Sequence, residues 1–486
     1  MLYDKLKMYS ESGVYPFHMP GHKRNPMLCD GIMPYEIDLT EIDGFDNLHN
    51  AEGCILEVQN LAEKLYNVKK AFLLVNGATG GILSAVRAMT DRGDKVIVAR
   101  NSHKSVYNAL ELCGLTPKYI VPKVDKQFGI NCSITPSQAE KAIRENPDAK
   151  LLIITSPTYE GAVSDIKEIS RIAHLHNVSV LVDEAHGAHF PFSKSFPSEA
   201  VASGADAAVA SLHKTLPSLT QTALLLTSNE ELINPLAENL AIFETSSPSY
   251  VFMSSIEKCL DFCKNTKAFD EYIIRLNSFD EKCRELKNIK VLCYGNDNIK
   301  NHNFFDFDIS KITVSVKGLN INGVQLADKL RNDFKIEPEM VCSDYVLLIT
   351  TVCDTDEGFA RLVNALQIID RKCFFFFARL VNALQIIDRK CSAKELNYNN
   401  LFLSQPRIAL NPCDCSGKSG DFYRLKNSIN KISLEYVWAY PPGIPIVAKG
   451  EVITQEIVDT IFMQIENGIN VYSTKGKVPK EILCCE

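Results

Sequence analysis

Short apolar segments alternate with amphipathic helical segments over much of the chain, and this alternation constrains the fold more than any other feature. The segments predicted to be strands are 71–75, 95–99, 118–122, 151–155, 178–182, 207–211 and 223–227. Helical patterns, with apolar residues three and four positions apart, separate most of these segments. This order predicts an α/β fold with a mostly parallel, doubly wound sheet and helices on both faces.

The length of 486 residues exceeds what one ordinary hydrophobic core accommodates. The parts that we expect are an N-terminal arm over 1–50, a large domain over 51–265, and a linker helix with a smaller α+β C-terminal domain over 266–486. The smaller domain has its own mixed pattern, in which strands over 312–316 and 345–351 flank a helix over 323–334.

One segment of the predicted smaller domain is duplicated. The sequence FARLVNALQIIDRKC occupies 359–373 and again 377–391, and Phe374, Phe375 and Phe376 separate the copies. A solenoid requires several diverged units, so this perfect repeat does not predict one. Both copies are amphipathic helices, but one position in a small domain accommodates only one of them. We expect one copy to pack and the other to be extruded or to lengthen a helix.

Composition excludes several classes of function. The net charge of −7 and the pI of about 5.9 do not favour nucleic acid or an anionic membrane as a partner. No apolar run reaches the roughly 20 residues of a membrane span, and the first residues do not resemble a signal peptide. We therefore expect a cytoplasmic protein whose 16 cysteines are reduced. Cys413–Cys415 and Cys484–Cys485 lack the paired spacing of a zinc site, so we expect no metal.

Polar segments follow five of the predicted strands directly. These segments are 76–81, 101–104, 156–159, 183–186 and 211–214. Ligands of open α/β sheets bind beyond the carboxyl ends of the strands. We therefore expect these five segments to meet at one crevice, which is stronger evidence for a site than any single motif.

The segment Asn76–Gly81 is rich in glycine and precedes a helix. Its backbone N–H groups and the Thr79 hydroxyl suit a phosphate at the positive end of the helix dipole. The alternative is an ordinary strand–helix turn, and the segment matches neither the dinucleotide-binding nor the P-loop pattern.

Asp183 closes the apolar strand VSVLV. A carboxylate at this point serves as a cap, as a metal ligand or as the partner of a buried cation. Beside a pyridine nitrogen it would favour the protonated ring, which is the electron sink that carbanion chemistry requires. His186 and His189 follow Asp183, and their spacing leaves metal binding as a weaker alternative.

Lys214 follows the apolar segment AAVASL, and lysines are rarely buried without a partner. A desolvated lysine amine forms a Schiff base with a carbonyl, although a lysine also extends to solvent in many proteins. Ser211 and His213 flank it within reach of a phosphate. His103 follows another strand, where it either stacks on a flat cofactor and moves protons or caps the next helix.

Taken in order, these motifs resemble the ornithine/lysine/arginine decarboxylases, enzymes that use pyridoxal 5'-phosphate (PLP) on the aspartate-aminotransferase-like fold type I, in the short form without an N-terminal wing domain. The resemblance extends over nearly the whole chain. The segments that carry it are 17–23, 38–41, 46–49, 76–81, 101–105, 157–161, 183–189, 211–214, 440–445 and 450–451.

The resemblance implies a role for each site residue. Lys214 is the Schiff-base lysine, Asp183 the partner of the pyridine nitrogen and His103 the ring-stacking histidine. The phosphate contacts are Ala78, Thr79, Ser211 and His213, with Gly77 in the same loop and His186 near the ring. The family also implies a homodimer, or an assembly of dimers, with active sites at subunit interfaces.

The predicted reaction is decarboxylation of a basic L-amino acid, arginine or lysine before ornithine, to agmatine, cadaverine or putrescine. A different PLP reaction on the same fold, such as transamination, is one alternative. A homologue impaired by the internal repeat is another. The acids that could recognise the side chain of the substrate are Glu41, Asp43, Asp46 and Glu451.

Overall fold

A computed structural model describes residues 12–17, 46–292, 304–317, 319, 321–384, 405–440 and 443–486. Most of the predicted arm therefore lies outside the described residues. From the arm, β1 (Tyr15–Phe17) pairs in parallel with β13 (Ile336–Pro338), and Tyr15 donates a hydrogen bond to Asp354 over 2.7 Å. This end of the chain thus packs against a segment more than 300 residues later in the sequence.

The seven predicted strands form one seven-stranded sheet in the order β2-β9-β8-β7-β5-β3-β4. The bounds are β2 Lys70–Leu74, β3 Lys95–Ala99, β4 Thr116–Ile120, β5 Ala149–Thr155, β7 Ser179–Asp183, β8 Ala207–Ser211 and β9 Ala223–Thr227. Within this sheet β9 alone runs opposite to the other six strands. The predicted fold class, a mostly parallel sheet in an α/β protein, is confirmed.

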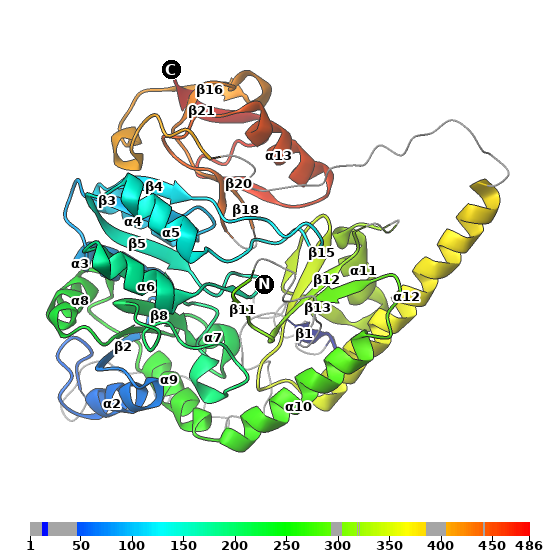
Figure 1. Cartoon of the computed structure of the whole chain (residues 1–486), viewed down its shortest axis with the longest axis horizontal. Coiled ribbons are helices and arrows are strands. Elements are labelled where there is room, and N and C mark those ends of the chain that lie inside the picture. The colour runs from blue at the N-terminus through cyan, green and yellow to red at the C-terminus, as the bar shows by residue number, and fades with distance from the viewer. Residues whose placement is uncertain are drawn as a thin grey trace.

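Helices cover both faces of this sheet (Figure 1). On one face lie α3 (Gly77–Ala88), α4 (Lys104–Cys113) and α8 (Glu230–Phe243); on the other lie α2 (Cys54–Tyr66), α5 (Pro136–Glu145) and α6 (Ile166–Leu175). In β3, Val96 and Val98 pack into the first layer, and Ile97 and Ala99 pack into the second. Burial on both sides explains why the strands are apolar without alternation.

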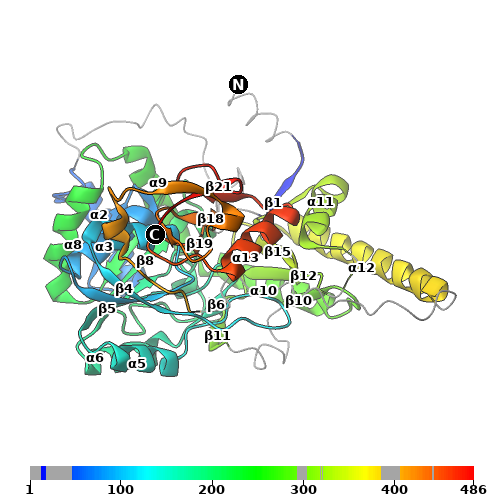
Figure 2. The same cartoon turned by 90° about the horizontal axis from the view of Figure 1, so that it is seen from above.

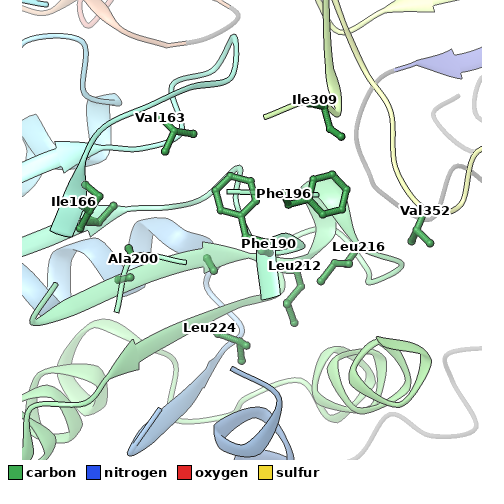
Figure 3. Close-up of a cluster of buried hydrophobic side chains, with 14 of the residues drawn as sticks. Val163, Ile166, Phe190, Phe196, Ala200, Leu212, Leu216, Leu224, Ile309 and Val352 are labelled. Carbon is green, nitrogen blue, oxygen red and sulfur yellow. The ribbon is translucent and has the colours of Figure 1, made fainter. Parts of the chain in front are cut away.

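A second unit follows the linking helices α9 (Tyr250–Cys263) and α10 (Thr266–Cys283). Its antiparallel sheet has the order β10-β12-β15-β14, and α11 (Gly323–Phe334) packs beside it. The strands are β10 Lys290–Leu292, β12 Lys311–Ser315, β14 Met340–Val341 and β15 Tyr345–Ile349. A two-stranded sheet joins β6 (Ala162–Val163) of the large domain to β11 (Asp306–Phe307). In Figure 3, Ile309 and Val352 of this unit lie in one apolar cluster with Phe196 and Leu216 of the large domain.

The duplicated segment lies on helix α12 (Asp356–Leu384). Its first copy packs through Phe359, Leu362, Leu366 and Ile369 into the apolar core. The helix continues into the second copy as far as residue 384, and Figures 1 and 2 show this end leading away from the rest of the chain. The second copy therefore lengthens a helix over 377–384, and residues 385–391 lie outside the described part.

The last 80 described residues, 405–440 and 443–486, form a third unit above β3 and β4 in Figure 1. It has two three-stranded sheets, β16-β21-β17 and β19-β18-β20, and helix α13 (Gln455–Glu466). The strands are β16 Asp421–Arg424, β17 Ile432–Ser433, β18 Val437–Ala439, β19 Pro445–Val447, β20 Val471–Ser473 and β21 Glu481–Cys485. The region expected to be one smaller domain thus contains two separate groups of sheets.

A buried arginine attaches this third unit to the large domain. Arg100, directly after β3, binds both carboxylate oxygens of Glu451 at 3.0 and 3.1 Å. It also donates to the carbonyl oxygen of Pro445 over 2.8 Å. Separately, no helix among the described residues combines the length and apolar composition that crossing a bilayer requires.

Candidate active site

A cavity of about 250 Å³ lies where β2, β3, β5, β7 and β8 end. Every residue predicted above for catalysis or cofactor binding lines it: Gly77, Ala78, Thr79, His103, Asp183, His186, Ser211, His213 and Lys214. The lining residues that the prediction did not assign to the cofactor are Asn101, Ser105, Thr155, Tyr159, Ala185, Tyr440 and Ile444. The parallel strands bring these distant residues together because their carboxyl ends share one edge of the sheet.

The predicted glycine-rich loop is the first part of a helix. Helix α3 begins at Gly77, whose φ of +70° favours glycine, and no side chain caps its first turn. Asn76, at the cap position, instead donates its amide to the carbonyl oxygen of Phe243. The N–H groups of the first turn therefore suit an anion in the cavity. Nearby, the buried Ser211 hydroxyl has no hydrogen-bond partner within the described residues.

Lys214 lies on the short helix α7 (Leu212–Thr215), directly after β8. Its Nζ is 3.1 Å from Nε2 of His186. Burial lowers the pKa of the Lys214 amine, while the Asp183 and Glu339 carboxylates oppose this shift. Burial also holds the pKa of His186 well below its usual value, so the ring is neutral, and its tautomer with the proton on Nδ1 accepts a hydrogen bond from the Lys214 amine at Nε2.

Asp183 is the last residue of β7 and is buried. Burial raises the pKa of its carboxyl group, and the Lys214 amine opposes this effect. The backbone N–H of Ala185 donates to Oδ1 over 3.2 Å and fixes the orientation of the side chain. Asp183 is therefore placed to stabilise a positive charge inside the cavity.

His103 both caps a helix and faces the cavity. Its Nδ1 accepts the backbone N–H of Ser105 at the start of α4 and lies 2.9 Å from the Ser105 hydroxyl oxygen. Burial lowers the pKa of His103 to about 3, so the ring is neutral. The two interpretations of this histidine, a helix cap and a cavity residue, are thus compatible.

Comparisons with known proteins identify the family of this chain. A family model described as "Orn/Lys/Arg decarboxylase, major domain" matches residues 1–325. The arginine decarboxylase of Bacillus subtilis (strain 168) is 32% identical over 483 residues, covering 97% of this chain and 94% of that protein. The chain belongs to the Orn/Lys/Arg decarboxylase family. Among solved structures, a lysine decarboxylase from Francisella novicida has a TM-score of 0.75 at 18% identity, covering 90% of this chain and 73% of that one.

In this member of the decarboxylase family, a buried ionic network lies behind the cavity. Lys311 Nζ is 2.8 Å from Asp308, whose other oxygen is 3.1 Å from His189 Nε2. Lys311 also lies 3.5 Å from the carbonyl oxygen of His186. From the sequence, His189 was a possible metal ligand. In the structure its Nε2 instead pairs with Asp308. The described residues contain no group of three or more side chains that could hold a metal ion.

Of the four acids predicted to recognise the substrate side chain, the two that the structure describes are bound to other groups of the protein. Asp46 accepts backbone N–H groups at the start of α2, and Glu451 is paired with Arg100. Glu41 and Asp43 lie outside the described residues. Glu339, to which the Tyr159 hydroxyl donates a hydrogen bond, was not among the residues predicted from the sequence. Only the folded chain relates Tyr159, after β5, to an acid 180 residues later.

Proposed function

We propose that this chain is a PLP-dependent decarboxylase of a basic L-amino acid, with arginine as the leading substrate, lysine next and ornithine third. The observation that carries the proposal is the buried Lys214 amine at a cavity that also holds Asp183 and the open N-terminus of α3. Similarity over nearly the full length to proteins named arginine decarboxylase supports arginine as the substrate.

The polar groups of the cavity fit the cofactor. The buried atoms Ser211 Oγ, Asn101 Oδ1 and His186 Nδ1 have no partners within the part of the chain that the structure describes. Unsatisfied buried polar atoms are costly, so three at one cavity favour a polar ligand. The first turn of α3 and Ser211 would hold the phosphate of PLP, and Asp183 would contact its ring nitrogen. Bound there, PLP would supply the electron sink for cleavage of the bond between the substrate Cα and its carboxylate.

The protein side chains contribute binding, orientation and proton placement. We assign Lys214 as the amine that holds the cofactor carbonyl, and His186 as the neutral acceptor that positions this amine. His103, neutral and fixed by Ser105, would pack on the cofactor ring. Tyr440 and Ile444, from the third unit, border the cavity and would limit the entry of water.

The test is an assay of the purified chain with PLP and each of the three amino acids. We expect agmatine from arginine at the highest kcat/KM, with cadaverine from lysine next, measured by chromatography of the amines. Formation of a keto acid without amine would select transamination instead. Absence of amine from all three substrates would contradict the proposed function.

The repeat provides a second test. Deleting residues 374–391 removes the spacer and the second copy, and α12 should still pack through its first copy. If only the shortened protein released amine, the impaired homologue would be the correct interpretation. The homodimer and the cytoplasmic location stay predictions, and light scattering of the purified protein checks the first.

A further inference from the structure

Tyr159 and Glu339 form a polar pair beside the cavity. Tyr159 lines the cavity, and its ring centroid lies 4.4 Å from that of His186. Its hydroxyl donates a hydrogen bond to the carboxylate of Glu339, which lies between β13 and β14. The backbone N–H of Glu339 donates to the carbonyl oxygen of Leu347 over 2.9 Å. The Tyr159 hydroxyl thus holds the carboxylate, and β15 holds the backbone at Glu339.

The charge of Glu339 acts inside the cavity. Together with Asp183, it is a carboxylate that favours the charged form of the Lys214 amine. Asp183 is assigned to the ring nitrogen of the cofactor. Glu339 therefore supplies a second negative charge to the cavity, from the side of Tyr159, to which it is hydrogen-bonded.

The other buried acid next to Tyr159 fits a cationic substrate less well. Glu160 accepts a hydrogen bond from the Tyr345 hydroxyl over 3.0 Å, and burial raises the pKa of its carboxyl group. Burial therefore favours the neutral acid at this position. Neither Glu160 nor Glu339 lines the cavity itself, but Glu339 is hydrogen-bonded to Tyr159, which does, whereas the partner of Glu160, Tyr345, does not.

We propose that Glu339, positioned by the Tyr159 hydroxyl, binds the cationic end of the substrate side chain. This inference rests on the proposed function, because it presumes a basic amino acid bound with its reacting end at Lys214. A carboxylate accepts several hydrogen bonds at once, so the Tyr159 hydroxyl and a substrate cation can share it. A guanidinium would bind it with two parallel hydrogen bonds, and an ammonium would make a point contact.

The test compares Glu339→Gln with a matched control in the PLP-loaded protein. Glu337→Gln makes the same change two residues away on β13, where Glu337 is paired with Arg331 at 2.7 Å. Binding of agmatine, measured by titration calorimetry, should weaken roughly tenfold or more in Glu339→Gln, because a hydrogen bond between charged groups is lost. The KM for arginine should rise similarly with a smaller change in kcat, and Glu337→Gln should match the wild type.

The outcomes separate this inference from the proposed function. If Glu339→Gln binds agmatine as tightly as the wild type, the inference is wrong, whatever the enzyme decarboxylates. If the wild type binds agmatine through Glu339 but releases no amine from arginine, lysine or ornithine, only the proposed function is wrong. If Glu339→Gln does not fold, Tyr159→Phe decides, because it keeps the ring and removes the hydroxyl that holds Glu339. An unchanged affinity for agmatine in Tyr159→Phe would then overturn the inference.

Discussion

The cavity has two walls of different origin. The sheet wall comprises the cavity residues between Gly77 and Lys214, and the outer wall comprises the later residues that line or support the cavity: Asp308, Lys311, Glu339, Tyr440, Gly443, Ile444 and Glu451. Parallel strands place the sheet wall, because all their carboxyl ends lie at one edge. The outer wall depends on how two further units pack against the sheet. The difference separates what secondary structure determines from what tertiary packing determines.

The largest expected effect concerns the sheet wall. Lys214→Ala removes the amine that we assign to the cofactor, so decarboxylation should fall by about a thousandfold or more. The visible absorbance of the PLP-loaded protein should also disappear. Lys141→Ala, at an exposed position of α5, is the control and should keep both signals. If the absorbance of Lys214→Ala matched that of the wild type, the assignment of the site would be wrong.

The next largest effect concerns the negative charge of Asp183 in the same wall. Asp183→Asn keeps the shape of the side chain and an acceptor for the N–H of Ala185, but removes the negative charge beside the ring nitrogen. We expect kcat to fall by roughly a hundredfold, because the electron sink requires a protonated ring. Measurement of kcat at saturating PLP checks this. A variant within threefold of the wild type would show that the charge of Asp183 is not needed.

Much of the sheet wall was predictable from the sequence, and most of the outer wall was not. His103, Asp183 and Lys214 each lie at or just beyond the carboxyl end of an apolar strand, and the parallel sheet predicted from the strand–helix alternation places those ends together. From the sequence, Glu451 was as suitable as the other three acids for binding the substrate side chain. In the structure it forms an ion pair with Arg100 instead. No local pattern relates Arg100 to Glu451, because each residue has its partner in another unit. The start of α3 at Gly77 was also missed, since glycines there resemble a loop.

Substitutions in the outer wall should lower the free energy of unfolding more than they lower the rate of the reaction. Asp308→Asn leaves the Lys311 ammonium buried without its carboxylate, which typically costs about 3–5 kcal/mol of folding free energy. Urea unfolding measures this loss. Asp328→Asn, which breaks an exposed pair with Arg331, should cost less than about 1 kcal/mol. Equal stabilities for the two variants would mean that the buried network does not support the outer wall.

The same network gives a pH dependence with a definite sign. Burial opposes ionisation of Asp308, but Lys311 and His189 outweigh it and hold the pKa of Asp308 well below its usual value. A carboxyl whose pKa is depressed on folding adds stability above its unfolded-state pKa, and that stability is lost as the pH falls toward the folded-state value. The difference in unfolding free energy between wild type and Asp308→Asn should therefore shrink below about pH 4. A difference that stayed constant down to pH 3 would contradict this linkage.

The smallest effect tests how closely the two walls touch. Gly443 has a φ of +84°, and a Cβ there would lie 3.4 Å from the His103 ring. Gly443→Ala therefore combines backbone strain of about 1–2 kcal/mol with a new van der Waals contact against a cavity residue. Gly476→Ala, at a φ of +70° with open space around its Cβ, carries the strain alone. Both variants should lose similar stability in urea, but only Gly443→Ala should lower kcat/KM, by a few-fold. Equal activity in the two variants would mean that the outer wall leaves His103 room to move, so that the sheet wall alone sets the position of its ring.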